Sequence, residues 1–166
     1  ATRCSYGFPA ARQGNRIFVT RRNVDKENIT KDDFVAVSMD YIFGDQRFSV
    51  ITDGIGLTDK MKPSVTYHGP HKPSVDSPIQ LSLFSIYKNV NYIIHGHVYV
   101  KGAPLTDSKL PCGAMEESDA VTKVIPDVGQ SNFCVNLWGH GCLIMAQDLD
   151  YFKNIELMAR PFPEGD

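Results

Sequence analysis

The sequence lacks the features that mark a nucleic-acid-binding protein or a membrane protein. Lysine and arginine number 17 against 19 aspartate and glutamate, a formal net charge of -2, and the charges form no block of one sign. Nothing in this pattern favours nucleic acid or an anionic membrane as a partner. No apolar run approaches the roughly 20 residues that a membrane helix needs. The opening segment ATRCSYGFPAARQGN lacks the apolar middle of a signal peptide.

Paired cysteines are also missing. The four cysteines, Cys4, Cys112, Cys134 and Cys142, form no CxxC motif, and two of them lie in the apolar runs FCVNLW and CLIM. A free thiol in such a run behaves as a small hydrophobic group, so we expect reduced cysteines and a cytoplasmic protein. With 166 residues, 42% of them hydrophobic, we expect residues 1–166 to form a single domain with one core.

Strand and helix signals alternate along the chain. Short runs rich in β-forming residues predict strands over Arg16–Thr20, Phe34–Ser38, Gln46–Thr52, Tyr92–Val100, Asn132–Trp138 and Cys142–Ala146. The stretch Asp53–Pro73, rich in Gly and Pro, predicts a long loop. Helices are predicted from Ser77, with Ser77 as N-cap and Pro78 in the first position, over Glu116–Val124, and after Asp148 through Leu157 or Met158.

Three histidines carry the strongest chemical signal. His95 and His97 lie two residues apart in a predicted strand, so their side chains share a face, and Gly96 between them leaves room on the other face. His140 lies between two glycines after another strand, where the backbone can approach closely. Three protein ligands with an open fourth position are typical of a catalytic zinc site. The alternative is that these histidines are held in the core or in loops by backbone hydrogen bonds.

The order of the motifs resembles that of the class II aldolase/adducin family, which includes fuculose-phosphate aldolase and ribulose-phosphate 4-epimerase. The similar segments are KPSVDSPIQLSLFSIYKNVNYIIHGHVYV, LPCGAMEESDAV and VNLWGHGCLIMAQDLDYFKNIELMA, within roughly Gly7 to Arg160. Each motif is short, but their order is specific. The resemblance implies an α/β fold: a three-layer α/β/α class II aldolase-like domain with a mostly antiparallel central sheet.

The same resemblance implies roles for particular residues. The family's three zinc ligands fall on His95, His97 and His140, and its acid/base carboxylate falls on Asp76. A carboxylate just before a helix is also a common cap, so a purely structural role for Asp76 stays open. Ser74 falls on a substrate-binding position. The implied function is that of a zinc-dependent lyase (aldolase) or epimerase, using Zn2+ or another divalent metal. It would act on a small-molecule hydroxy-carbonyl, sugar-like substrate through a metal-stabilised enediolate.

The sequence departs from the family pattern at its anion-binding motifs. The GNxSxR motif lies over Gly7–Arg12, so its Asn and Ser become Phe8 and Ala10. The Thr-Pro-Thr-Gly turn lies over Thr20–Asn23, and the second Ser of PSSE is Val75. Arg21 and Arg22 offer fork-like donors for an anion, although a solvated basic turn is the simpler interpretation. We expect the chain to be shortened at both ends relative to the family, and a homotetramer is implied.

Several alternatives remain at this point. A non-catalytic adducin-like binding module would keep the scaffold without the phosphate-binding groups, although such a module has no need for three convergent imidazoles. A metal-dependent hydrolase would be favoured if His68 or His71 held a second metal; solvent exposure is the default for both. Asp107 is a weak stand-in for a second acid and fits a turn better. The pairs Glu116-Glu117 and Asp148-Asp150 are interpreted as acidic helix starts.

Overall fold

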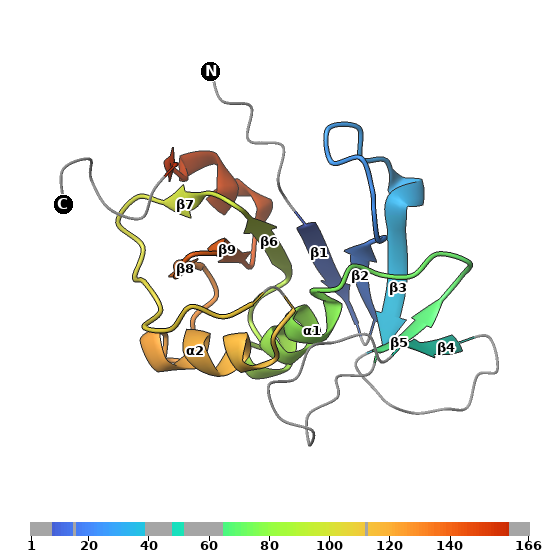
Figure 1. Cartoon of the computed structure of the whole chain (residues 1–166), viewed down its shortest axis with the longest axis horizontal. Coiled ribbons are helices and arrows are strands. Elements are labelled where there is room, and N and C mark those ends of the chain that lie inside the picture. The colour runs from blue at the N-terminus through green and yellow to red at the C-terminus, as the bar shows by residue number, and fades with distance from the viewer. Residues whose placement is uncertain (1–7, 15, 39–47, 52–64, 112, 160–166) are drawn as a thin grey trace.

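A central sheet of eight strands organises the protein (Figure 1). The structure, a computed structural model, describes residues 8–14, 16–38, 48–51, 65–111 and 113–159. In this part of the chain every pair of neighbouring strands in the sheet is antiparallel. The spatial order is β4 (Phe48–Ile51), β5 (Val65–His68), β3 (Phe34–Ser38), β2 (Arg16–Thr20), β1 (Phe8–Gln13), β6 (Tyr92–Gly96), β9 (Gly141–Ala146) and β8 (Phe133–Leu137).

Helices cover one face of the sheet around β6, β9 and β8. The helices α1 (Ser77–Ile86) and α2 (Glu116–Val124) bury apolar side chains such as Leu83 and Val121 against Ile93 of β6. On the other face, the 3-10 helix η2 (Leu149–Asn154) packs against a smaller cluster. Beside it lies a ribbon of β7 (Tyr99–Val100) and β10 (Leu157–Met158). A second short 3-10 helix, η1 (Lys31–Asp33), precedes β3. The three-layer α/β fold with an antiparallel sheet is therefore confirmed.

Most of the predicted strands and helices are present. The strands Arg16–Thr20 and Phe34–Ser38 and the helix Glu116–Val124 have the predicted bounds. β4, β8 and β9 fall within one or two residues of their predictions. Helix α1 begins with Ser77 itself, and the N-cap is Asp76. Cys134 and Cys142 are buried free thiols as expected, whereas Cys4 and Cys112 lie outside the described residues.

Three predictions of secondary structure need correction, and one strand is not predicted from the sequence. The segment after Asp148 forms η2 and then β10 instead of one α-helix. Leu149 and Leu157 are 61% and 49% exposed, so they do not belong to a single buried face. The predicted loop Asp53–Pro73 contains β5, while residues 53–64 lie outside the described part. The predicted strand Tyr92–Val100 is broken into β6 and β7 by a bend after Gly96. Finally, the sequence pattern does not predict β1.

Arg12 of β1 joins the sheet to the carboxyl end of α1. Its guanidinium donates hydrogen bonds to the carbonyl oxygens of Phe84 at 3.0 Å and Lys88 at 2.6 Å, and also to the carbonyl of Val90. A cation satisfies the unpaired carbonyls there and complements the negative end of the helix dipole. Arg12 aligns with the Arg of the family's GNxSxR motif, and these hydrogen bonds give it a structural role in this protein. None of the helices that the structure describes has the length and hydrophobicity of a transmembrane span.

Candidate metal centre

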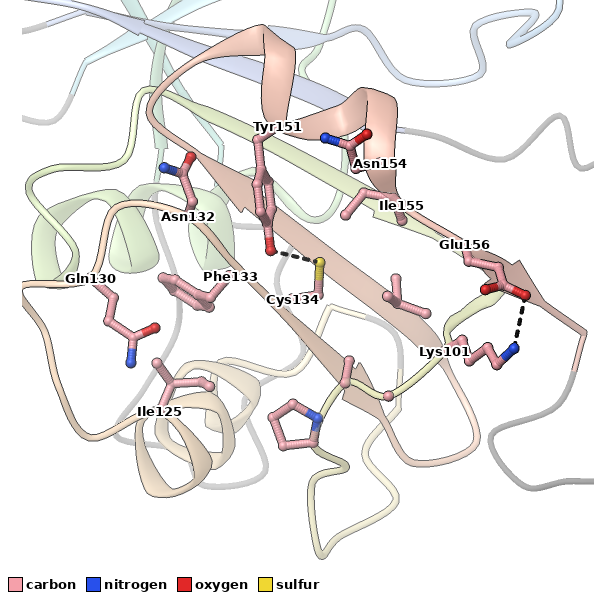
Figure 2. A pocket seen from close by; sticks show the side chains of 14 residues that line it. Lys101, Ile125, Gln130, Asn132, Phe133, Cys134, Tyr151, Asn154, Ile155 and Glu156 are labelled. Atoms are coloured by element: carbon pink, nitrogen blue, oxygen red, sulfur yellow. Dashed lines mark hydrogen bonds and ion pairs between the residues drawn. The ribbon is translucent and has the colours of Figure 1, made fainter.

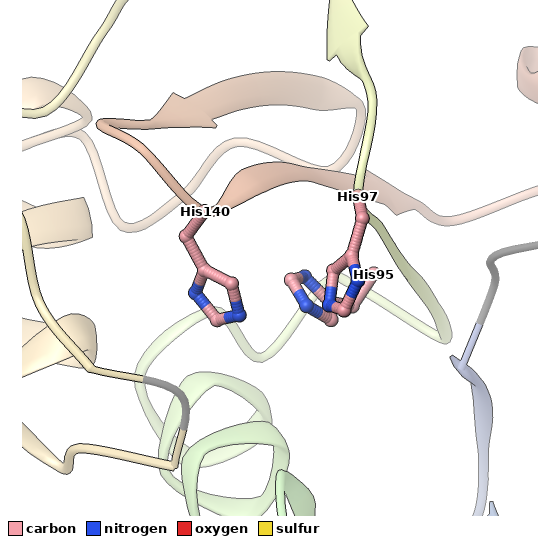
Figure 3. Close-up of side chains that lie close together, drawn as sticks. All are labelled: His95, His97 and His140. Carbon is pink, nitrogen blue, oxygen red and sulfur yellow. The ribbon is translucent and has the colours of Figure 1, made fainter.

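Three histidines from two separate parts of the sheet converge at one end of it (Figure 3). His95 is in β6, His97 lies in the bend that follows, and His140 lies in the turn between β8 and β9. The ring centroids are 4.6 Å apart for His95 and His140, 5.2 Å for His95 and His97, and 5.4 Å for His97 and His140. Among the described residues this is the only cluster of three or more metal-ligand side chains.

Gly141 allows the β8–β9 turn to approach the end of β6. A Cβ atom added to Gly141 would lie 2.0 Å from the carbonyl oxygen of Gly96 and 2.9 Å from the Cα atom of His97. Gly141 also has a φ of +144°, a conformation that L side chains rarely adopt. The glycine after His140 therefore lets its ring reach those of His95 and His97.

Hydrogen bonds fix the orientation of the imidazoles of His95 and His140. His95 is 1% exposed, and its Nδ1 lies 3.0 Å from the carbonyl oxygen of Cys142. The Nδ1 of His140 lies 2.9 Å from Oε2 of Glu117 in the first turn of α2. A carbonyl oxygen and a carboxylate accept hydrogen bonds, so Nδ1 is the protonated nitrogen of both rings and Nε2 carries the lone pair. Both Nε2 atoms are buried.

The surroundings of His95 and His97 favour the neutral form of both imidazoles. Burial lowers the pKa of His95 to about 3, with His140 and His97 lowering it further. Burial and then the nearby His140 also lower the pKa of His97. A neutral imidazole is the form that binds a metal, since a protonated ring has no lone pair to donate.

The arrangement fits a divalent metal held by three histidines. One nitrogen from each ring lies within 4.8 Å of the other two. In a tetrahedral zinc site with bonds of about 2.0–2.1 Å the ligand nitrogens are about 3.4 Å apart, so small side-chain rotations would close the difference. The hydrogen bonds that orient His95 and His140 are the outer contacts that metal-bound histidines usually make.

Asp76 lies beside this cluster at the N-cap of α1. Its side chain is 4% exposed and makes no capping hydrogen bond to the helix. Its negative charge raises the pKa of His97 against the lowering effects, and it contributes to a raised pKa of Glu117, for which burial is the larger cause. Asp76 is therefore within electrostatic range of one histidine and of the carboxylate that holds another. The capping hydrogen bond that would have given Asp76 a simple structural role is not formed.

The turn before α1 is tied to the turn after β2. Ser74 is 2% exposed, its amide donates to the carbonyl of Thr20 at 2.9 Å, and its hydroxyl oxygen accepts a long hydrogen bond of 3.4 Å from the amide of Asp76. Asn23 has a φ of 59°, at the position where the family turn has glycine, and Asn tolerates this conformation better than most residues. Asn23 thus adopts a conformation that glycine also adopts readily. The substrate-binding role of Ser74 stays a prediction.

Other candidate residues lie away from the cluster or are engaged elsewhere. His68 and His71 are exposed and do not belong to the metal-ligand cluster of the described residues. Asp107 is exposed and accepts a hydrogen bond from the hydroxyl of Ser108, as expected in a turn. Arg21 pairs with Asp33, with 2.8 Å between Nε and Oδ1. The guanidinium of Arg21 is thus held by a carboxylate.

Glu117 is the site residue that the sequence did not reveal. The sequence predicts an acidic helix start at Glu116-Glu117, and α2 does begin at Glu116. Glu117 is nevertheless 4% exposed and contacts His140. Acidic first turns are common at helices without any function, so no sequence signal separates this residue from its neighbours.

A cavity lies elsewhere in the fold (Figure 2). It has a volume of about 560 Å³ and is bordered by Phe133 and Cys134 of the edge strand β8 and by η2. The hydroxyl of Tyr151 and the Sγ of Cys134 are 3.5 Å apart within it. Burial raises the pKa of the Cys134 thiol, which is then a poor nucleophile. None of the three histidines lines this cavity, so the histidine cluster lies outside it.

The comparisons with known proteins agree with this geometry. The family model described as "Class II Aldolase and Adducin N-terminal domain" matches residues 3–154. A search of curated proteins finds no significant match.

Three solved structures show how far the fold is shared. An L-fuculose 1-phosphate aldolase has a TM-score of 0.61 and 16% identity, over 90% of this chain and 69% of its own. The L-fuculose-1-phosphate aldolase of Thermus thermophilus has a TM-score of 0.53 and 14% identity, over 87% of this chain and 71% of its own. A sugar-phosphate aldolase of Thermotoga maritima has a TM-score of 0.59 and 11% identity, over 89% of this chain and 78% of its own. At these identities the structures show a common fold.

Proposed function

The chain belongs to the class II aldolase and adducin family, and we propose that it is a zinc-dependent enzyme of the aldolase or epimerase type. Its substrate would be a hydroxy-carbonyl, sugar-like compound. The observation that carries this proposal is the convergence of His95, His97 and His140, with ligand atoms within 4.8 Å of one another. An interaction module has no use for three imidazoles arranged in this way.

The histidines would hold the metal, with zinc favoured by the all-nitrogen ligand set. When bound, the metal supplies a Lewis acid that polarises a carbonyl group. His95 and His140 are held by the carbonyl of Cys142 and by Glu117, and His97, which is exposed, completes the set from the bend after β6. His95 and His140 are thus oriented before the metal binds.

Asp76 is the proposed general acid/base. Asp76 is 4% exposed, lies near His97 and makes no capping hydrogen bond to α1, and from this position it would exchange a proton with a substrate carbon or hydroxyl. Ser74, in the same turn, would contribute to substrate binding. These two roles follow from the family resemblance and from the position of the turn beside the histidines.

Metal content is the first test. Elemental analysis of the purified protein should find about one zinc per chain, with loss of zinc in both His95→Ala and His140→Ala. His68→Ala serves as the control, because His68 is exposed and lies outside the cluster. A wild-type protein that stays without metal after zinc is added would overturn the enzyme proposal and favour the adducin-like binding module. Loss of zinc in His68→Ala as well would favour a second metal and the hydrolase alternative.

Activity with ketose and aldol substrates would then test Asp76. We expect Asp76→Asn to lower kcat by about 10²–10⁴-fold, the usual contribution of a general acid or base, while zinc content stays unchanged. Asp148→Asn is the matched control, since Asp148 is an exposed residue before η2 without a capping hydrogen bond. Nearly full turnover in Asp76→Asn would contradict the assignment. The homotetramer implied by the family stays a prediction, which light scattering would check.

A further inference from the structure

We propose that Glu117 is a positioning residue that holds the ring of His140 in the tautomer needed for metal binding and thereby sets the affinity of the site for its metal. This inference rests on the proposed metal centre. It concerns a residue that neither touches the metal nor carries out the reaction.

The contact between the two side chains is short and enclosed. Oε2 of Glu117 lies 2.9 Å from Nδ1 of His140, and the side chains are 5% and 10% exposed. A buried carboxylate costs several kcal/mol unless it is paired and hydrogen-bonded. The imidazole N–H of His140 supplies that partner, and the same bond leaves the lone pair on Nε2. The carboxylate therefore selects the tautomer of His140 that can bind a metal.

The location of His140 explains why such a restraint matters. His95 is part of β6, and its Nδ1 partner is the backbone carbonyl of Cys142, so no side-chain substitution can remove that bond. His140 lies in the turn between β8 and β9, where the strand ladder does not fix the ring. Its hydrogen bond reaches across to a different element, α2. Glu117 thus connects the first turn of α2 to a histidine whose Nδ1 is held by a side chain and not by the backbone.

A purely structural role for Glu117 makes a different prediction. An acidic residue in the first turn stabilises a helix through the dipole, and Asp119 offers the same charge in the same turn. Asp119 is exposed, whereas Glu117 is 4% exposed and faces the histidines. Asp119→Asn therefore removes a first-turn charge without disturbing His140, which makes it the matched control.

The experiment has two readouts. The first is the zinc affinity measured by competition with a chromophoric chelator, for the wild type, Glu117→Gln, Glu117→Ala and Asp119→Asn. We expect a loss of about 10-fold for Glu117→Gln, where an amide can still accept the hydrogen bond, and about 100-fold for Glu117→Ala. Asp119→Asn should bind zinc as the wild type does.

The second readout is the tautomer of His140 in the metal-free protein, from the ¹⁵N chemical shifts of its ring. The wild type and Asp119→Asn should show the Nδ1–H form, and Glu117→Ala a mixture of both neutral forms. A helix-stabilising role would not alter these shifts. The inference is overturned, and the metal centre stands, if Glu117→Ala keeps a single Nδ1–H tautomer. It is also overturned if the wild type binds zinc and both Glu117→Gln and Glu117→Ala bind it as tightly as the wild type does. A wild type that binds no zinc would overturn the proposed function, together with the effect of Glu117 on affinity.

Discussion

Replacing Gly141 by alanine should damage both the fold and the metal site. The added Cβ atom would lie 2.0 Å from the carbonyl oxygen and 2.9 Å from the carbonyl carbon of Gly96, and 2.9 Å from the Cα atom of His97. All three are backbone atoms of the segment that carries two of the histidines. They cannot rotate aside as a side chain would, so the β8–β9 turn must move away from the end of β6, and His140 must move with it.

The size of the effect follows from two costs. Placing alanine in a conformation that favours glycine costs about 1–2 kcal/mol, taking the left-handed penalty as a guide. Overpacking against a rigid neighbour costs about 1–3 kcal/mol more. We therefore expect Gly141→Ala to lower the free energy of unfolding by about 2–5 kcal/mol. Gly139→Ala is the matched control: its φ is +66°, and its Cβ would meet only the flexible side chain of Lys109, at 3.0 Å. Its cost should be about 1–2 kcal/mol.

Urea unfolding of the metal-free proteins, with linear extrapolation to water, gives the two free energies. Zinc affinity, measured on the same samples, should fall sharply in Gly141→Ala and little in Gly139→Ala. If Gly141→Ala unfolds at the same urea concentration as Gly139→Ala, or if its zinc affinity is that of the wild type, the close approach of the two segments does not hold the site together.

Three further substitutions test contacts outside the metal centre. Arg12→Ala should cost about 1–3 kcal/mol in urea unfolding, because the carbonyls at the end of α1 lose a charged donor; an unchanged midpoint would contradict this role. Asn136→Ala should cost about 2–3 kcal/mol and speed the hydrogen exchange of the Val100 amide, which donates to Asn136 at 2.8 Å; exchange at the wild-type rate would argue against it. Burial raises the pKa of Tyr87 to about 12, so its neutral phenol adds stability that is present below its unfolded pKa of about 10 and is lost as the pH rises toward 12. Tyr87→Phe should give up the 2.6 Å hydrogen bond to the Ile125 carbonyl, about 1 kcal/mol, and lose stability less steeply in that alkaline range; an identical alkaline profile would contradict the sign.

The sequence alone predicts those strands and helices whose local residue pattern agrees with their packing in the fold. RIFVT and FVAVS are short runs of β-forming residues, and their central positions Ile17, Val19, Val35 and Val37 are buried in the core. The helix Glu116–Val124 has acidic residues in its first turn and Lys123 in its last, as the helix dipole favours. The histidine cluster could also be predicted, because the HxH spacing and the GHG turn limit where the rings can point.

Elsewhere the tertiary structure overrode the local pattern. The strand β1 contains Pro9 and two alanines, which are poor strand signals, and it forms because it fills the position between β2 and β6. The segment from Leu149 has helical spacing, but Tyr151, Phe152 and Ile155 pack against the sheet through a 3-10 helix, and β10 then pairs with β7. In these segments the partner across the fold decided the structure, and no single stretch of sequence contains that partner.

The two buried acids of the site show the same limit for function. In the sequence Asp76 and Glu117 both look like helix-start residues, which are stabilising without any chemistry. In the structure neither behaves in that way, because Asp76 makes no capping hydrogen bond and Glu117 contacts His140. Burying a carboxylate is costly unless it is paired and hydrogen-bonded, and Glu117 has that partner in His140. Asp76 acts on His97 through its charge. Both acids therefore interact with histidines that lie far away in the sequence, and the residues around each helix start do not contain those histidines.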